Sequence, residues 1–115
     1  MAADAILTLA GSEWGYANEN GPNERFVQFG GDSLVSGSGG CNRFSGRYDQ
    51  AGDGIAIKDM GVTLMECFDS AVVDREAAFF KILNACRRIE ATHLVLKLYG
   101  VDGALLAELA RRDVD

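Results

Sequence analysis

Histidine and proline are nearly absent from this sequence, which holds one of each, His93 and Pro22, in 115 residues. A single imidazole excludes the histidine clusters on which many zinc and hydrolytic sites are built. The three cysteines, Cys41, Cys67 and Cys86, are widely spaced and form no C-x-x-C pair. The sequence therefore lacks a zinc-knuckle motif, and we expect no metal site.

Basic residues are also scarce, because 11 lysines and arginines face 17 aspartates and glutamates, a formal net charge of -6. Such a chain has no electrostatic attraction for polyphosphate, so nucleic acid is excluded as an expected partner. No apolar run approaches the roughly 20 residues of a transmembrane helix. Asp4 stands where a signal peptide would be basic, so we expect a cytoplasmic protein as the sequence stands, or a periplasmic or envelope protein if a leader was removed.

Glycine is abundant, with 14 residues, and apolar side chains alternate with polar ones over much of the chain. This alternation is typical of half-buried strands joined by tight turns. Residues 3–11 are apolar enough for a short helix or an edge strand. Further strands are expected at residues 14–17, 25–29, 34–37, 43–49, 55–57, 62–65, 93–99 and 104–109.

One segment has helical periodicity instead. Its apolar stripe consists of Phe79, Ile82, Leu83, Cys86 and Ile89, a spacing that places all five on one helix face. We expect an amphipathic helix at about residues 70–89, with an N-cap among Asp69, Ser70 and Asp74. Glu76 is expected near its first turn, and Arg87 and Arg88 at its C-terminal end, where they suit the helix dipole.

The order of these elements predicts a single domain over residues 1–115 of the α+β class, mainly β. About seven to eight short strands, with one helix before the last hairpin, favour a strongly curved antiparallel sheet or a partly open β-barrel. A parallel α/β fold would require more helices.

The glycine cluster at residues 37–42, G-S-G-G-C-N, invites comparison with phosphate-binding loops. Asn42 stands where a dinucleotide-binding loop has its third glycine, and a strand rather than a helix follows. No Gly-Lys-Ser/Thr step completes a P-loop either. We therefore interpret the glycines as a bulge or tight corner with positive φ, in which Asn42 bonds local backbone.

The run G-S-G-G-C-N-R-F-S-G-R-Y at residues 37–48 closely resembles the G-C-N-x-x-x-G-x-Y signature of the META domain (HslJ-like) family. Three further elements occur in that family's order: L-A-G-S-E-W at residues 9–14, T-L-M-E-C at residues 63–67, and E-x-x-F from Glu76 to Phe79. The resemblance covers about residues 7–110. The family-motif residues in this chain are Gly40, Cys41, Asn42, Gly46, Tyr48, Thr63, Met65 and Cys67.

The resemblance implies a small antiparallel β-rich domain of a largely bacterial family, loosely linked to heat shock, motility and virulence, with no established catalytic residues. It also implies a disulfide between Cys41 and Cys67. The bridge and a pair of reduced, packed thiols both remain open, because a reducing cytosol opposes a disulfide. Cys86, on the apolar stripe, is expected in the core.

These observations favour a non-enzymatic, stress- or envelope-associated binding module whose ligand is a protein or a small apolar molecule. No catalytic, cofactor or metal residues are assigned, and no cofactor is expected. One alternative is a thiol-dependent enzyme in which His93 activates Cys41, although His93 is expected to face solvent. Another is a barrel that encloses a small apolar ligand. The oligomeric state is not indicated by the sequence.

Overall fold

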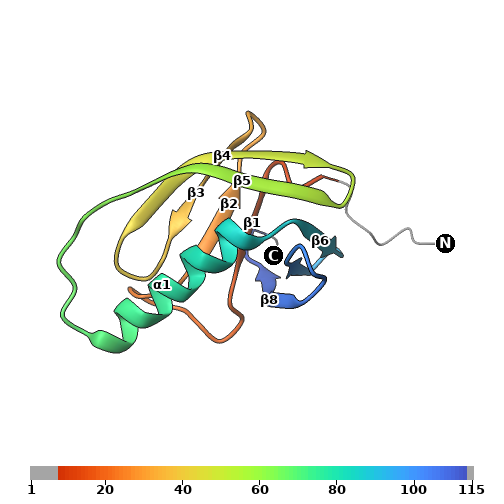
Figure 1. The fold of residues 1–115 in the computed structure, drawn as a ribbon. Helices are drawn as coiled ribbons and strands as arrows, with labels where there is room; N and C mark the ends of the chain where they lie inside the picture. Colours follow the sequence, from red (N-terminus) through yellow and green to blue (C-terminus); the bar gives the residue numbers. More distant parts are fainter. Residues whose placement is uncertain (1–7, 114–115) are drawn as a thin grey trace.

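The computed structural model describes residues 8–113, which form eight strands and one helix (Figure 1). In chain order they are β1 (Ser12–Gly15), β2 (Phe26–Phe29), β3 (Leu34–Ser38), β4 (Arg43–Ala51), β5 (Gly54–Val62), α1 (Ser70–Ala85), β6 (Arg88–Ala91), β7 (Val95–Tyr99) and β8 (Leu105–Arg111). Each strand pairs antiparallel with the next, and β8 pairs with β1 to close a barrel. The predicted mainly-β barrel with one helix before the last hairpin is confirmed.

The alternation of the sequence places one face of each strand in the core. On β4, Phe44 and Tyr48 are buried while their neighbours on the strand are exposed or half-buried. The core is filled by side chains from every strand and from the helix, among them Trp14, Phe29 and Phe79, which are fully buried. Helix α1 lies across the barrel beneath the long β4–β5 hairpin (Figure 1) and supplies its apolar face to this core.

The separate strands predicted at residues 55–57 and 62–65 are wrong, because β5 is continuous from Gly54 to Val62. Gly61 does not break the strand but pairs with Ser45 on β4. The ladder shifts register between Ser45 and Arg47, and Asp59 on β5 has a positive φ of 56°. A β-bulge therefore absorbs the irregularity that the glycine suggested.

The helix is shorter than predicted. Asp69 is the N-cap, as expected, and its side chain accepts a hydrogen bond from the Ala71 N–H. The helix ends at Ala85 because Cys86 adopts an extended conformation and the Arg87 N–H donates to the carbonyl of Tyr99. Ile89 is buried as predicted, but in β6. The helix thus ends before the last residues of the apolar stripe, because the chain there pairs with the sheet instead.

The chain ends also differ from expectation. Residues 8–11 form a turn rather than a helix or strand, and residues 3–7 of that predicted element lie outside the described part. The first strand begins at Ser12 instead of Trp14. Near the C-terminus, Arg111 and Arg112 form ion pairs, Arg111 with Asp113 and Arg112 with Glu13 and Glu24.

The order of the strands determines which connections meet. In a barrel of successive antiparallel strands, the β1–β2 and β3–β4 connections and the C-terminal end of β5 share one end. The β2–β3, β4–β5 and β6–β7 connections share the other end. Cys41, between β3 and β4, therefore lies at the end of the barrel where β5 leads into the connection to α1.

Candidate functional site

The connection between β3 and β4, residues 39–42, is here called the cysteine loop. Gly40 has a φ of 116°, in the region that disfavours other residues. A Cβ on Gly39 would lie 2.5 Å from Cγ of Glu76 and 2.7 Å from the Phe80 ring. The prediction that these glycines make a tight corner is confirmed, and close approach of the helix is a second reason for them.

Glu76 of α1 is the residue against which the cysteine loop folds. It is only 8% exposed, and its Oε2 accepts hydrogen bonds from the N–H groups of Cys41 (2.9 Å) and Asn42 (2.5 Å). Its Oε1 accepts from Nδ2 of Asn42 (2.9 Å). The backbone donors that could have bound an external anion are therefore satisfied by a carboxylate of the same chain. The sequence predicted only that Glu76 lies near the first helical turn and did not predict that it accepts hydrogen bonds from the cysteine loop.

Asn42 connects the cysteine loop to the chain that follows β5. Its Oδ1 accepts from Oγ1 of Thr63 (3.0 Å) and from the N–H of Met65 (2.6 Å). Oγ1 of Thr63 also accepts from the N–H of Arg43 (3.0 Å). The expectation that Asn42 bonds local backbone is wrong, because its amide oxygen reaches groups more than 20 positions along the chain. Three family-motif residues, Asn42, Thr63 and Met65, thus meet at one place.

The two cysteines meet there as well. Cys41 and Cys67 lie at disulfide-bonding distance, with Cα atoms 6.3 Å apart, and both are half-buried. This Cα separation is within the range that disulfides adopt. The segment 63–69, here called the tethered segment, is therefore attached to the barrel at Thr63, at Met65 and at Cys67.

The tethered segment holds large apolar side chains in solvent. Leu64 is 97% exposed, Phe68 89% and Met65 61%. Figure 1 shows this connection between β5 and α1 extending away from the barrel. Beside it is a hollow of about 280 Å³. The hollow is lined by Pro22, Asn23, Gly40, Cys41, Met65, Cys67, Phe68, Asp69 and Val72.

The other two family-motif residues support the barrel. A Cβ on Gly46 would lie 2.8 Å from the carbonyl oxygen of Lys58, so glycine is required where β4 passes the bulge. The Tyr48 hydroxyl donates to the carbonyl of Gly30 (2.7 Å). Burial, followed by the charge of Asp32, raises the pKa of Tyr48, which keeps the hydroxyl protonated as a donor.

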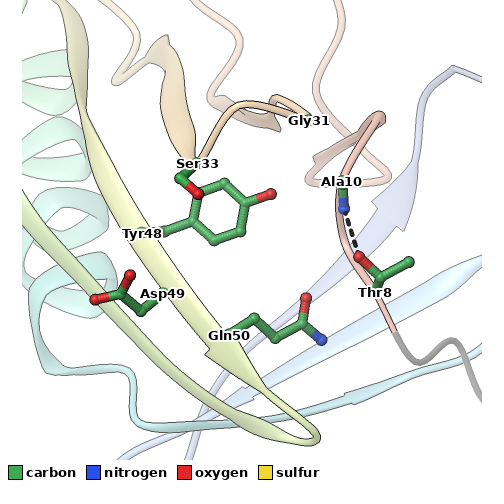
Figure 2. Close-up of a pocket in the computed structure, with 7 residues that line it drawn as sticks. All are labelled: Thr8, Ala10, Gly31, Ser33, Tyr48, Asp49 and Gln50. Carbon is green, nitrogen blue, oxygen red and sulfur yellow. Dashed lines mark hydrogen bonds between the residues drawn. The ribbon is translucent and has the colours of Figure 1, made fainter.

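Tyr48 also lines a polar hollow of about 310 Å³ at the opposite end of the barrel. Figure 2 shows its ring directed between Ser33 and the Thr8–Ala10 segment, while Asp49 points to the other side of the strand. The Asp49 carboxylate pairs with Lys58 at 2.5 Å. Gln50 accepts from the N–H of Leu9 (2.8 Å). Tyr48, Asp49 and Gln50 of this hollow are thus each held in a structural contact.

The residues of the thiol-enzyme alternative are not brought together. His93 is exposed in the β6–β7 connection, and Cys41 lies in the β3–β4 connection at the other end of the barrel. The sulfur that would act as nucleophile is also in contact with Cys67. His93, the base of that alternative, therefore lies at the opposite end of the barrel from Cys41 and cannot activate it.

Cys86 is fully buried, as predicted, and burial raises the pKa of its thiol. Since the thiolate is the reactive form, we expect Cys86 to resist alkylation in the native protein. Iodoacetamide at pH 8, followed by mass spectrometry, should modify Cys86 at least tenfold faster in 6 M guanidinium chloride than in buffer. Equal rates in the two conditions would contradict the buried position.

Within residues 8–113, no three His, Cys, Asp or Glu side chains are grouped as a metal site would require. In the same part of the chain, α1 is too short and too polar to cross a bilayer.

The fold and the site define a class: small closed antiparallel β-barrels with one helix, in which a cysteine pair fastens the connection after the fifth strand and a buried glutamate holds the loop between the third and fourth strands. The family model of the META domain matches residues 8–113, nearly the whole chain, and the protein belongs to that family. The resemblance found in the sequence is confirmed. No curated protein matches the sequence.

Solved structures share the fold. The chain is similar to a Burkholderia xenovorans protein solved by NMR, with 18% identity, a TM-score of 0.74, and coverage of 92% of this chain and 85% of that one. It is also similar to a crystal structure of a DUF4847 family protein from Bacteroides vulgatus, with 18% identity, a TM-score of 0.61, and coverage of 93% and 96%. At these identities the likeness extends to the fold alone.

Proposed function

We propose that this protein is a non-enzymatic binding module that holds a protein partner on its tethered segment, in a stress- or envelope-associated setting. One observation carries the proposal. The cysteine pair and the Asn42 side chain fix a segment whose Leu64, Met65 and Phe68 remain exposed. The buried Glu76 in turn holds the cysteine loop to which this segment is attached. Family membership supports the setting.

The energetics favour binding by this segment. Exposed apolar side chains bring a stabilisation of roughly 25 cal/mol for each Å² removed from water on binding. A mobile loop would lose part of that gain in ordering its side chains and backbone. The bonds of Asn42 to Thr63 and Met65 fix this loop before a partner arrives. The tethered segment is therefore preorganised.

The same observations favour binding at the surface over binding inside the barrel and over a catalytic function. The interior of the barrel holds the packed core, including Trp14, Phe29 and Phe79. The two polar groups best placed for chemistry, Glu76 and Asn42, are each occupied by several hydrogen bonds. A small apolar ligand and a thiol-dependent reaction thus have less support than a protein partner.

Selection from a phage-displayed library of random 12-residue peptides tests the proposal. We expect enriched peptides to bind the native protein and to bind L64S/M65S/F68S at least tenfold more weakly. The matched control L94S/V101S/L105S removes three exposed apolar side chains in or beside the β6–β7 and β7–β8 connections and should stay within twofold. Circular dichroism should show both variants folded. Failure to enrich any peptide, or equal binding to all three proteins, would overturn the proposal.

A further inference from the structure

The surroundings of the tethered segment carry charge of one sign. Residues 59–74 include four acidic residues, Asp59, Glu66, Asp69 and Asp74, and no lysine, arginine or histidine. Glu66 and Asp69 lie in the tethered segment and Asp74 lies in the first part of α1, and all three are exposed. The apolar side chains Leu64, Met65 and Phe68 are thus interleaved with carboxylates in the sequence.

The arginines close to this region in the sequence or in the sheet only partly balance that charge. Arg75 lines a separate hollow together with Glu19, and Arg25 is paired with Glu19 at 2.5 Å. Arg43 lies beside the segment, since its carbonyl accepts a hydrogen bond from the Thr63 N–H. Three exposed carboxylates therefore stand in or near the tethered segment, against one arginine whose backbone adjoins it, and the local charge is acidic.

We propose that the occupant of this surface is a protein segment in which apolar side chains are flanked by lysine or arginine. This inference rests on the proposed function and specifies its partner. A purely apolar partner would remove water from the carboxylates without compensating their charge, and an acidic partner would repel them. Lysine or arginine side chains compensate that charge. An anionic membrane is disfavoured for the same reason, reinforced by the net charge of -6.

The hollow beside the segment indicates how the two interactions combine. Met65, Phe68 and Val72 form its apolar wall, and Asp69 stands among its lining residues. Oδ1 of Asp69 caps α1 by accepting from the Ala71 N–H (2.9 Å), and the carboxylate offers a second oxygen. An apolar side chain in the hollow would place a neighbouring lysine or arginine close to that carboxylate.

The peptides selected above test the inference. We expect lysine plus arginine to exceed aspartate plus glutamate by about threefold among enriched sequences. A synthetic copy of one peptide, measured by fluorescence anisotropy, should bind at least fivefold more weakly in 300 mM than in 50 mM NaCl, because salt screens exposed charges. The variant E66Q/D69N/D74N should bind it about tenfold more weakly, while asparagine at position 69 preserves the helix cap.

The control D53N/D102N/E108Q changes the net charge equally at exposed positions elsewhere and should bind within twofold of the native protein. Enriched peptides without a basic excess, or equal binding by the two charge variants, would overturn the inference and leave the proposed function standing. Absence of any enriched peptide would overturn both. Tighter attachment to phosphatidylglycerol vesicles through Leu64, Met65 and Phe68 than to any peptide would replace the protein partner by a membrane.

Discussion

Glu76→Ala is expected to destabilise the protein by about 3 kcal/mol, because it leaves three hydrogen-bond donors in a part-buried loop without their acceptor. The donors are the N–H groups of Cys41 and Asn42 and the Asn42 side-chain amide. For a domain of this size the melting temperature should fall by roughly 10–20 °C. Urea unfolding and thermal denaturation followed by circular dichroism measure both quantities.

Glu76→Gln tests whether the protein's stability depends on the carboxylate of Glu76 or only on the size of its side chain. Both oxygens of Glu76 accept hydrogen bonds, so an amide would turn one donor group toward another donor. We therefore expect glutamine to recover less than half of the loss. Asp74→Ala, an exposed position on the same helix, is the control and should change stability by no more than about 0.5 kcal/mol. A stable Glu76→Gln variant would show that the two-sided acceptor is unnecessary.

Removing the cysteine pair, as Cys41→Ser/Cys67→Ser, is expected to cost about 3 to 4 kcal/mol under oxidising conditions, from the entropy of closing a loop of this length. The two residues are 26 positions apart. Urea denaturation of the native protein with and without dithiothreitol should show the same difference, and the double variant should not respond to the reductant.

The thiol count in denaturant without reductant checks the covalent state. One reactive thiol, that of Cys86, is the expected result, since Cys41 and Cys67 would be joined. Three reactive thiols in protein purified under oxidising conditions would show that the pair is packed but reduced. The bonds of Asn42 to Thr63 and Met65 would then be the main attachment of the tethered segment.

Local patterns made much of the fold predictable. The alternation around Phe44 and Tyr48 placed β4, because successive side chains of a strand face opposite sides. The N-cap at Asp69 followed from the preference of short polar side chains for helix starts. Leu94 alternates in the sequence with Leu96 and Leu98, which are buried, but Leu94 itself is 53% exposed because β7 begins only at Val95.

The roles of the motif residues were less accessible. The resemblance selected Cys41, Asn42, Thr63, Met65 and Cys67 as a set, but the bonds among them connect positions more than 20 residues apart. Glu76 entered the sequence interpretation as part of E-x-x-F, and the pattern of a helix cannot show which surface loop its carboxylate will meet. The exposure of the tethered segment was missed because residues 62–65 fit a strand pattern.

By itself, the sequence determined the class, the family and the inward face of most strands, since these depend on short-range periodicity and on motifs of fixed order. Only the tertiary structure decided that β5 continues to Val62, that α1 ends at Ala85, and that Glu76 and Asn42 bind the cysteine loop. The reason is physical: hydrogen bonds and sheet pairing between distant segments override local preference, and only the closed barrel brings those segments together.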